Sequence, residues 1–287
     1  MSRFDDHASD AHDHDRGLSL DLPTLLSRRR LLGLLGGVGA AAVAGCAAAD
    51  SGGSATPAGS TTIAAGAATT GTTAAATAAA GEQIPEETAG PFPGDGSNGI
   101  NVLTESGIVR SDITRSFGSG SAVAAGVPLT IALTVLGTAN GSAPLAGAAV
   151  YLWHCDREGR YSLYDREISN ENYLRGVQET DGQGSVRFAS IFPAAYSGRW
   201  PHIHFEVYPS LAAATTASGK LRTSQLALPE DASTRVYATD GYEASVRNLA
   251  QTSLATDNVF RDGYSLQLGT VTGDVTGGMT VRLSVPV

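Results

Sequence analysis

The sequence predicts an all-β protein: an antiparallel β-sandwich with long loops and one short helix, preceded by a disordered N-terminal tether. Three observations predict this fold class. Short runs of β-branched and aromatic residues are separated by Gly, Pro, Asn and Asp turns. Helical periodicity appears in one stretch of suitable length, residues 241–254. Residues 47–83 are almost entirely Ala, Thr, Gly and Ser, which cannot bury enough apolar surface to offset their chain entropy.

Residues 1–46 have the features of an export signal. The pair Arg28-Arg29 precedes a weakly hydrophobic stretch rich in Gly and Ala, as in twin-arginine (Tat) signals. The stretch ends in the letters VAGC, which resemble a bacterial lipoprotein cleavage site with Cys46 as the lipidated first residue of the mature chain. A membrane-spanning anchor and ordinary cleavage followed by secretion are the alternatives. We therefore expect export by Tat, with the protein attached to the extracellular face of the cell membrane or secreted.

The remaining residues, 84–287, are enough for one domain with a hydrophobic core. The chain has 19 Lys and Arg against 28 Asp and Glu, a formal net charge of −9, and nothing in this balance favours nucleic acid. The cysteines are Cys46 and Cys155. If Cys46 is lipidated, no internal disulfide can form, so the exported domain must be stabilised by its core.

The elements of this domain are expected in a simple order. Residues 84–93, rich in proline, should form an extended N-terminal arm that lies over other structure, and residues 94–126 should form a long loop. The one helix is expected over residues 241–254. Strands are expected at 127–136, 148–155, 185–188, 202–208, 221–228, 264–271 and 279–285.

Reactive side chains are densest just before and within the fourth of these strands. His202 and His204 are two residues apart, so on a strand both imidazoles face the same side. Their Cα atoms would lie about 6 to 7 Å apart, which lets both rings bind one metal ion. Tyr196 and Arg199 immediately precede the strand, and Tyr161 follows an earlier strand through a glycine turn.

Two imidazoles and two phenolates form a hard, anionic donor set suited to ferric iron. A free phenol has a pKa of about 10, but a bound cation favours the phenolate. Zinc usually binds His, Cys and carboxylate, and ferrous sites usually combine two histidines with a carboxylate. Glu206 shares the strand face of the two histidines and is the alternative ligand. His154, beside Cys155, is interpreted as a satisfied buried histidine, because neighbouring strand residues face opposite ways.

From about Glu87 to the C-terminus, the sequence resembles the intradiol ring-cleavage dioxygenases, and in particular exported, single-domain bacterial members. The resemblance rests on the segments Thr88-Ala89-Gly90-Pro91-Phe92, Gly159-Arg160-Tyr161, Tyr196 with Arg199, Pro201-His202-Ile203-His204-Phe205 and Thr223-Ser224-Gln225-Leu226. Two features depart from the catechol and protocatechuate enzymes. The interval between Tyr196 and His202 is shorter, and the N-terminal helical dimerisation region of the catechol class is absent.

The resemblance implies a non-haem Fe(III) site. The iron ligands would be Tyr161, Tyr196, His202 and His204. Tyr196 would also be catalytic, as the phenolate that an incoming diol displaces. Arg199 would stabilise negative charge developing on the substrate ring, and Gln225 would orient the substrate or a water molecule.

The function expected from this resemblance is cleavage of the ring of catechol-type aromatics with O2 to muconate-type diacids. The partners would be a small catechol-type molecule and O2, with possible membrane attachment through Cys46 and no nucleic acid. Two alternatives remain. One is an envelope-tethered β-sandwich binding module with a degenerate metal site, and the other is a hydrolytic zinc site on the same two histidines.

Overall fold

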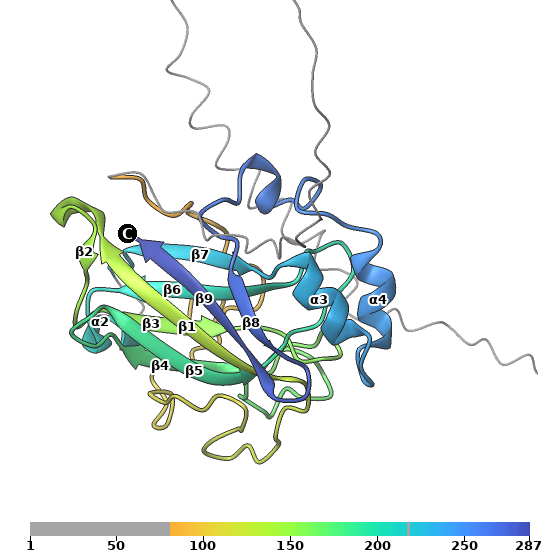
Figure 1. The fold of residues 1–287 in the computed structure, drawn as a ribbon. Coiled ribbons are helices and arrows are strands. Elements are labelled where there is room, and N and C mark those ends of the chain that lie inside the picture. The colour runs from red at the N-terminus through yellow and green to blue at the C-terminus, as the bar shows by residue number, and fades with distance from the viewer. Residues whose placement is uncertain (1–80, 217–218) are drawn as a thin grey trace, which may run out of the picture.

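The computed structural model describes residues 81–216 and 219–287. The expected signal at 1–46 and most of the expected linker at 47–83 lie outside these residues. Within the described ranges, none of the helices has the length and apolar character needed to cross a membrane. The described part begins three residues before the predicted domain start at 84, and it forms two packed β-sheets (Figure 1).

The first sheet is built around the long strand β1 (Pro128–Gly137). This strand pairs antiparallel with β5 (Ser185–Ile191) and parallel with β9 (Gly278–Pro286). Beyond β9 lies β8 (Thr270–Asp274), and the two-residue strand β2 (Ala143–Pro144) pairs with the end of β1. The sheet therefore contains one parallel pair, formed by strands from opposite ends of the domain.

The second sheet is entirely antiparallel, with the order β4, β3, β6, β7. Its strands are β3 (Ala149–Trp153), β4 (Arg175–Glu179), β6 (His202–Tyr208) and β7 (Arg222–Ala227). Strand β6 is central, and all seven of its residues are buried. Burial on both faces means that something other than the first sheet must cover one side of this strand.

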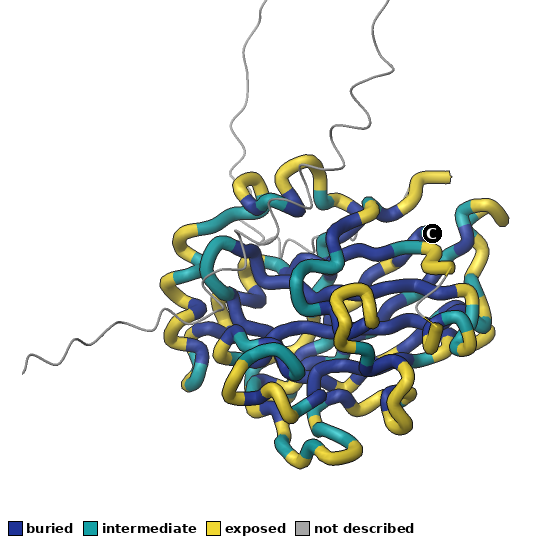
Figure 2. Tube along the Cα trace, turned by 180° about the vertical axis from the view of Figure 1, so that it is seen from behind, coloured by how far each residue is buried: buried dark blue, intermediate teal, exposed yellow. Residues whose placement is uncertain are grey.

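The main hydrophobic core lies between the two sheets. Along β1 the burial alternates, as expected for a strand with one face toward the core. Strand β6 contributes Ile203, Phe205 and Val207 to the same core. Each fully buried side chain of this size stabilises the fold by about 1.5 to 3 kcal/mol. Figure 2 shows the buried strands at the centre, with exposed segments confined largely to the connecting loops.

Loops rather than a third sheet cover the outer face of the second sheet. A separate buried cluster on this face combines Tyr151 and Trp153 of β3 with loop residues such as Leu103 and Tyr161. Because side chains alternate along a strand, His202 and His204 of β6 belong to this outer face. The sequence thus places the two histidines beneath loops, on the side of the sheet away from the main core.

The helices lie at the ends of the sandwich. The structure has α2 (Leu211–Thr215), α3 (Glu230–Tyr237) and α4 (Glu243–Leu249), together with the 3-10 turns η2 (Thr138–Asn140) and η3 (Phe260–Asp262). Figure 1 shows α3 and α4 side by side at one end. Buried residues of α3, including Val236 and Tyr237, pack against the main core.

The all-β sandwich predicted from the sequence is confirmed, with differences in its smaller elements. The helix expected over 241–254 is shorter, and α2 and α3 were not expected, since both are short and mostly polar or small. Strand β4 was also missed, because Arg175, Gly176 and Glu179 hide its alternation. The strand expected at 264–271 begins only at Thr270, since residues 264–267 form a turn.

The expected N-terminal arm, residues 84–93, is extended and lies along the domain as predicted. Its backbone bonds to two distant strands: Ile84 N–H donates to Pro286 O, and Glu87 N–H donates to Thr223 O. The far end of the arm is fixed by the buried guanidinium of Arg175. This group donates to Phe92 O at 2.9 Å and to Pro93 O at 2.8 Å.

Arg175 also bonds to the loop that contains Tyr161. Its Nε and Nη2 donate to Oγ and O of Ser162 at 3.1 and 2.9 Å, and its Nη1 donates to Tyr151 Oη at 3.1 Å. One buried cation therefore joins the arm, the loop and the outer face of the sheet. A planar group with five N–H donors can make such connections, whereas a lysine cannot.

We predict that Arg175→Met lowers the free energy of unfolding by about 2 to 4 kcal/mol, because several buried carbonyl groups lose their donors. Chemical denaturation measures the change. Arg187→Met on β5 is the matched control, since this arginine is exposed. Equal effects of the two substitutions would contradict the role given to Arg175.

Candidate active site

The two histidines of β6 converge on one point. His202 Nε2 lies 3.1 Å from His204 Nε2, and the ring centroids are 4.7 Å apart at an interplanar angle of 78°. Both rings are buried. The nitrogens face each other because the side chains leave the same face of the strand two residues apart. This is the arrangement that the sequence predicted.

The protonation of His202 follows from its surroundings. Its Nδ1 lies 2.6 Å from Trp200 O, and since a carbonyl can only accept, Nδ1 carries the hydrogen. Nε2 therefore presents a lone pair toward His204. Burial, followed by the charge of Arg199, holds the pKa of His202 well below its usual value. The imidazole is neutral, as metal binding requires.

The ring of His204 is fixed by stacking. Trp153, its neighbour on β3, lies parallel to it with centroids 4.9 Å apart and an interplanar angle of 6°. Burial, then the neighbouring His202 and Arg199, lowers the pKa of His204 well below its usual value. Trp153 is itself fully buried. It also determines the plane of the second imidazole.

Tyr196 comes from the loop that leads into β6. Its hydroxyl lies 3.3 Å from His202 Nε2, with the two rings edge to face at 5.6 Å. The side chain is half-buried, unlike those of the other three predicted ligands. The short interval between Tyr196 and His202 includes a turn at Gly198, where φ is +79°. This turn returns the chain so that the tyrosine lies over the histidines.

Tyr161 reaches the same place from the loop after β3. Its ring lies edge to face with those of Tyr196, at 6.0 Å, and His204, at 6.2 Å. The side chain is buried, and its hydroxyl has no hydrogen-bond partner among the described residues. Burial, followed by the nearby phenol of Tyr196, raises the pKa of Tyr161 well above its usual value. A buried hydroxyl without a partner is costly, by about 1 to 3 kcal/mol, and calls for an explanation.

The structure thus brings together all four residues that the sequence proposed as ligands. Their donor atoms come from two loops and one strand. Over the described ranges, no group of three or more His, Cys, Asp or Glu side chains is arranged to hold a metal ion. The phenol groups of Tyr161 and Tyr196 lie beside the two histidines, where they could serve as further ligands.

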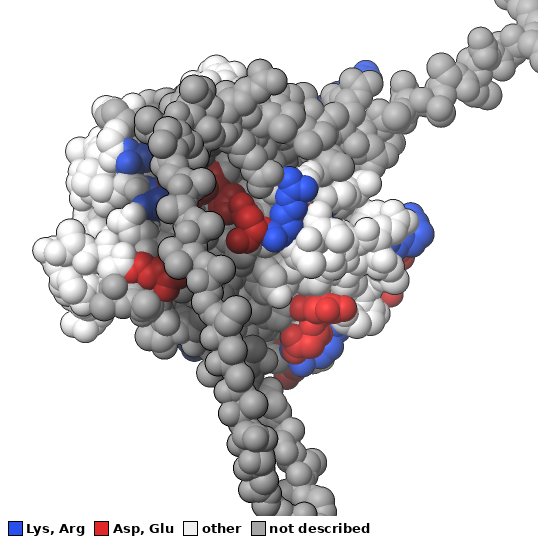
Figure 3. Space-filling view, turned by 90° about the horizontal axis from the view of Figure 1, so that it is seen from above, with Lys and Arg blue, Asp and Glu red and all other residues white. Residues whose placement is uncertain are grey.

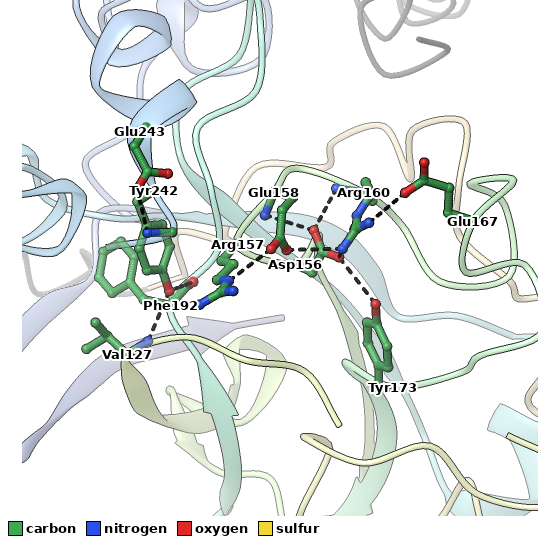
Figure 4. A network of polar contacts seen from close by, with 11 residues as sticks. Val127, Asp156, Arg157, Glu158, Arg160, Glu167, Tyr173, Phe192, Tyr242 and Glu243 are labelled. Carbon is green, nitrogen blue, oxygen red and sulfur yellow. Dashed lines mark hydrogen bonds and ion pairs between the residues drawn. The ribbon is translucent and has the colours of Figure 1, made fainter. Parts of the chain in front are cut away.

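The Tyr161 loop is held by the carboxylate of Asp156 (Figure 4). Asp156 Oδ1 accepts from the backbone N–H groups of Glu158 and Arg160, and Oδ2 accepts from Arg160 Nε and Tyr173 Oη, all at 2.9 to 3.2 Å. Arg160 extends the network to Glu167 through an ion pair of 2.9 Å. One buried carboxylate closes the turn that ends one residue before Tyr161.

The same turn also contacts the Tyr196 segment. Asp156 O accepts from Ala194 N–H at 3.1 Å. Gly159 has φ +88°, and a Cβ atom there would lie 3.2 Å from Tyr196 Cβ. A side chain at this position would be strained and would press on Tyr196. The glycine allows the two tyrosine loops to approach each other.

Arg199 and Gln225 lie beside these residues and bond to each other. Arg199 Nη2 donates to Gln225 Oε1 at 2.6 Å, and Gln225 Nε2 donates to Thr88 O of the N-terminal arm at 2.9 Å. Gln225 pairs with His204 in the register of β6 and β7. Arg199 Nε also donates to Asp257 Oδ2 at 2.9 Å, so its guanidinium is buried against a carboxylate.

Two other residues considered from the sequence lie outside this cluster of donors. Glu206 accepts from Lys220 Nζ at 2.7 Å and from Tyr208 Oη at 2.6 Å, so its oxygens are engaged further along the strand. His154 is a satisfied buried histidine, as interpreted. Its ring nitrogens bond to Cys155 O and Ser190 Oγ, both at 2.7 Å, and burial lowers its pKa to about 4.

Sequence reasoning missed Asp156, Asp257 and Arg175. An aspartate that closes a glycine turn gives a recognisable local signal at Asp156, whereas Asp257 is distant in the chain from Arg199 and gives none. Across the described part of one face, acidic and basic side chains lie next to each other (Figure 3). Closer to the site, Asp257 is instead paired with Arg199, and Asp156 with Arg160.

The carboxyl group of Glu87, in the arm near Arg199, provides a test of this buried environment. Burial, followed by the charge of Asp262, raises the pKa of Glu87 from 4.5 to about 8. Between these values the unfolded chain loses this proton and the folded chain keeps it, so stability falls as pH rises. We predict that Glu87→Gln abolishes this fall in the free energy of unfolding with pH, which amounts to up to about 1.4 kcal/mol per pH unit.

Unfolding free energies measured between pH 5 and 8 for both proteins provide the test of this effect. The exposed Glu105→Gln is the matched control and should keep the slope of the original chain. Parallel curves for the original chain and Glu87→Gln would show that Glu87 is already ionised in the folded protein.

Comparison with known proteins gives both a family and related sequences. Residues 105–231 match the sequence model of a family described as Dioxygenase. A stretch of 54 residues is 39% identical to catechol 1,2-dioxygenase 2 of Acinetobacter lwoffii and covers 19% of this chain and 19% of that protein. Another of 53 residues is 34% identical to chlorocatechol 1,2-dioxygenase of Rhodococcus opacus, over 18% of this chain and 21% of that protein. These matches span about a fifth of each curated relative.

The fold is also similar to that of a solved structure, an intradiol ring-cleavage dioxygenase from Tetranychus urticae. The likeness has a TM-score of 0.56 at 23% identity and covers 71% of this chain and 94% of that one. At this identity the similarity is evidence for a shared fold alone. The family match includes Tyr161, both histidines of β6, and the loop that joins them through Tyr196. The family-model match and the matching segments of catechol dioxygenases support an intradiol ring-cleavage dioxygenase family for this chain, and the fold agrees with it.

Proposed function

We propose that this protein is a non-haem Fe(III) intradiol dioxygenase that cleaves catechol-type aromatics with O2 to muconate-type diacids. The observation that supports this most directly is the convergence of two imidazoles and two phenols in one buried place. The Nε2 atom of His202 lies 3.1 Å from His204 Nε2 and 3.3 Å from Tyr196 Oη. Beside them lies the ring of Tyr161, whose hydroxyl has no hydrogen-bond partner among the described residues.

The donor chemistry fits ferric iron. Tyr161, Tyr196, His202 and His204 would hold the ion, with each histidine neutral and each phenol deprotonated on binding. A bound cation would also explain the unpartnered hydroxyl of Tyr161, which otherwise loses hydrogen bonding in the folded state. Two phenolates favour a trivalent ion over zinc, which usually binds His, Cys and carboxylate.

Bound there, the ion would act as a Lewis acid that stabilises the diol as its dianion and makes the ring reactive toward O2. The two tyrosines would then have different tasks. Tyr161 is buried and edge-on to two other rings, so it would stay in place. Tyr196 is half-buried, so its Oη is the phenolate that can move and take up a proton from the incoming diol.

Arg199 would stabilise negative charge on the bound substrate ring. Burial is the main cause of the lowered pKa values of His202 and His204, and the charge of the Arg199 guanidinium is a further cause. The positive charge of Arg199 is therefore felt at both candidate ligands. Gln225 presents its carbonyl oxygen to Arg199 and one N–H to Thr88 O. We therefore assign to Gln225 the task of holding Arg199 and the arm in place, with its remaining N–H available to the substrate or a water molecule.

The relatives support the substrate class. The curated proteins with matching segments are described as acting on catechol and chlorocatechol. In this chain the ring centroid of Phe92 lies 5.1 Å from that of Tyr161 and 5.2 Å from that of Tyr164. Aromatic rings beside the candidate ligands would favour a flat aromatic substrate.

The test is spectroscopic and catalytic. We expect the iron-loaded full chain to show a phenolate-to-iron charge-transfer band in the visible and to consume O2 with catechol. Tyr161→Phe and Tyr196→Phe should each alter the band and lower the rate by about 100-fold or more, since each removes a donor and one removes a proton acceptor. Tyr164→Phe, in the same loop as Tyr161, should keep the band.

A band unchanged in both variants would refute the ligand assignment. An iron-loaded protein with no oxygen uptake on a panel of catechols, whose ligand binding survives His202→Ala, would instead favour the tethered binding module.

We also propose that the protein is exported by the Tat route and attached to the membrane through a lipidated Cys46. The motif at Arg28-Arg29 and the letters VAGC before the Ala- and Thr-rich linker support this. Tat transports folded proteins, so iron could be loaded in the cytoplasm. We expect joint replacement of Arg28 and Arg29 by Lys to abolish export of the folded, iron-loaded protein, measured by cell fractionation.

The matched control for this export test is Arg16→Lys, which leaves the pair intact and should not change export. Undiminished export after replacement of the pair would refute the Tat assignment.

A further inference from the structure

The carboxylate of Asp257, in the loop after α4, accepts four hydrogen bonds. Its Oδ2 accepts from Arg199 Nε at 2.9 Å and from Trp200 N–H at 2.7 Å. Its Oδ1 accepts from the N–H groups of Val259 and Phe260 at 2.8 and 3.2 Å. The carboxylate is buried and accepts only from N–H groups, so it is satisfied as an anion.

Asp257 and Gln225 hold Arg199 from two sides. Asp257 bonds to Nε and Gln225 to Nη2, at 2.9 and 2.6 Å. A guanidinium is planar, so bonds at two separate nitrogens fix both its position and its plane. Arg199 therefore has one orientation relative to His202 and His204. Its charge adds to the effect of burial in lowering the pKa values of both histidines.

Stability alone is a weak reason for such a pair. Burying a guanidinium and a carboxylate costs desolvation energy that their attraction often only offsets, and apolar residues of similar size can be as stable. The pair lies beside the four candidate ligands rather than in the main core between the sheets. A fixed charge next to a reacting ring, however, gains from being oriented before the reaction begins.

We propose that Asp257 is a positioning residue that orients Arg199 toward the substrate pocket. This inference rests on the proposed dioxygenase function, because the charge that Arg199 stabilises is that of a bound diol. Asp257 does not touch the substrate and acts through Arg199 alone. It connects the loop after α4 to Arg199 and Trp200, which immediately precede strand β6.

The first test replaces Asp257 by Asn in the iron-loaded full chain. The amide has one acceptor oxygen for two sets of N–H donors, so its NH2 group must face either Arg199 and Trp200 or Val259 and Phe260. We expect kcat with catechol to fall at least tenfold. The dissociation constant for 4-nitrocatechol, read from the visible spectrum, should change less than threefold. Asp262→Asn, an exposed carboxylate on the same segment, is the matched control and should leave both values unchanged.

The second test is a double-mutant cycle with Arg199→Gln. If Asp257 acts through Arg199, then Asp257→Asn should change kcat less than twofold in the Arg199→Gln background. Equal losses in both backgrounds would overturn the inference, as would an Asp257→Asn protein with kcat within twofold of the original chain.

A third variant covers the case in which Asp257→Asn does not fold. Arg199→Lys keeps a cation opposite Asp257 but cannot also hold Gln225 through a rigid planar group, so kcat should again fall at least tenfold. An unchanged kcat in Arg199→Lys would overturn the inference. Failure of the proposed function has a different result: the original chain itself would show neither the visible band nor oxygen uptake.

Discussion

The strict alternation of side chains along β6 is the constraint on which the rest of the structure depends. Ile203, Phe205 and Val207 fill the core between the sheets, so His202 and His204 must face the opposite side. A shift of register by one residue would turn the core side chains toward the outer face and place the imidazoles in the core between the sheets. The hydrophobic core therefore determines where the histidines lie. Strand β7 places Gln225 next to His204, and the loops supply Tyr161, Tyr196 and Arg199.

Those loops are held by buried charged groups rather than by regular secondary structure. Asp156 closes the turn before Tyr161, Arg175 ties that loop to the N-terminal arm, and Asp257 fixes Arg199 before the strand begins. Each of these groups makes several hydrogen bonds to backbone atoms, which loops leave unsatisfied more often than strands do. A loop site becomes rigid in this way without a third layer of sheet, and the donor atoms keep their spacing.

The sequence predicts the parts of this arrangement that depend on local pattern. The two-residue spacing of His202 and His204 predicts that both lie on one face of a strand. The glycine turn after an earlier strand predicts that Tyr161 lies in a loop. By contrast, β4 was missed because Arg175 and Gly176 occupy it, although Arg175 is there to bond outside the sheet. Asp257 could not be inferred either, because its contact with Arg199 joins segments 58 residues apart in the chain. Contacts of this kind depend on tertiary packing, which a single sequence does not encode in any local period.

Tyr161 and Tyr196 differ in how deeply they are buried. Tyr161 packs among Phe92, Tyr196 and His204 and has no room to change its contacts without disturbing three rings. Tyr196 lies on a turn that contains Gly198 and retains contact with solvent, so its displacement costs less buried area. Gly159 allows the two loops to approach closely, because any side chain there would press against Tyr196 Cβ. The two phenols thus differ in burial and packing although their chemistry is identical.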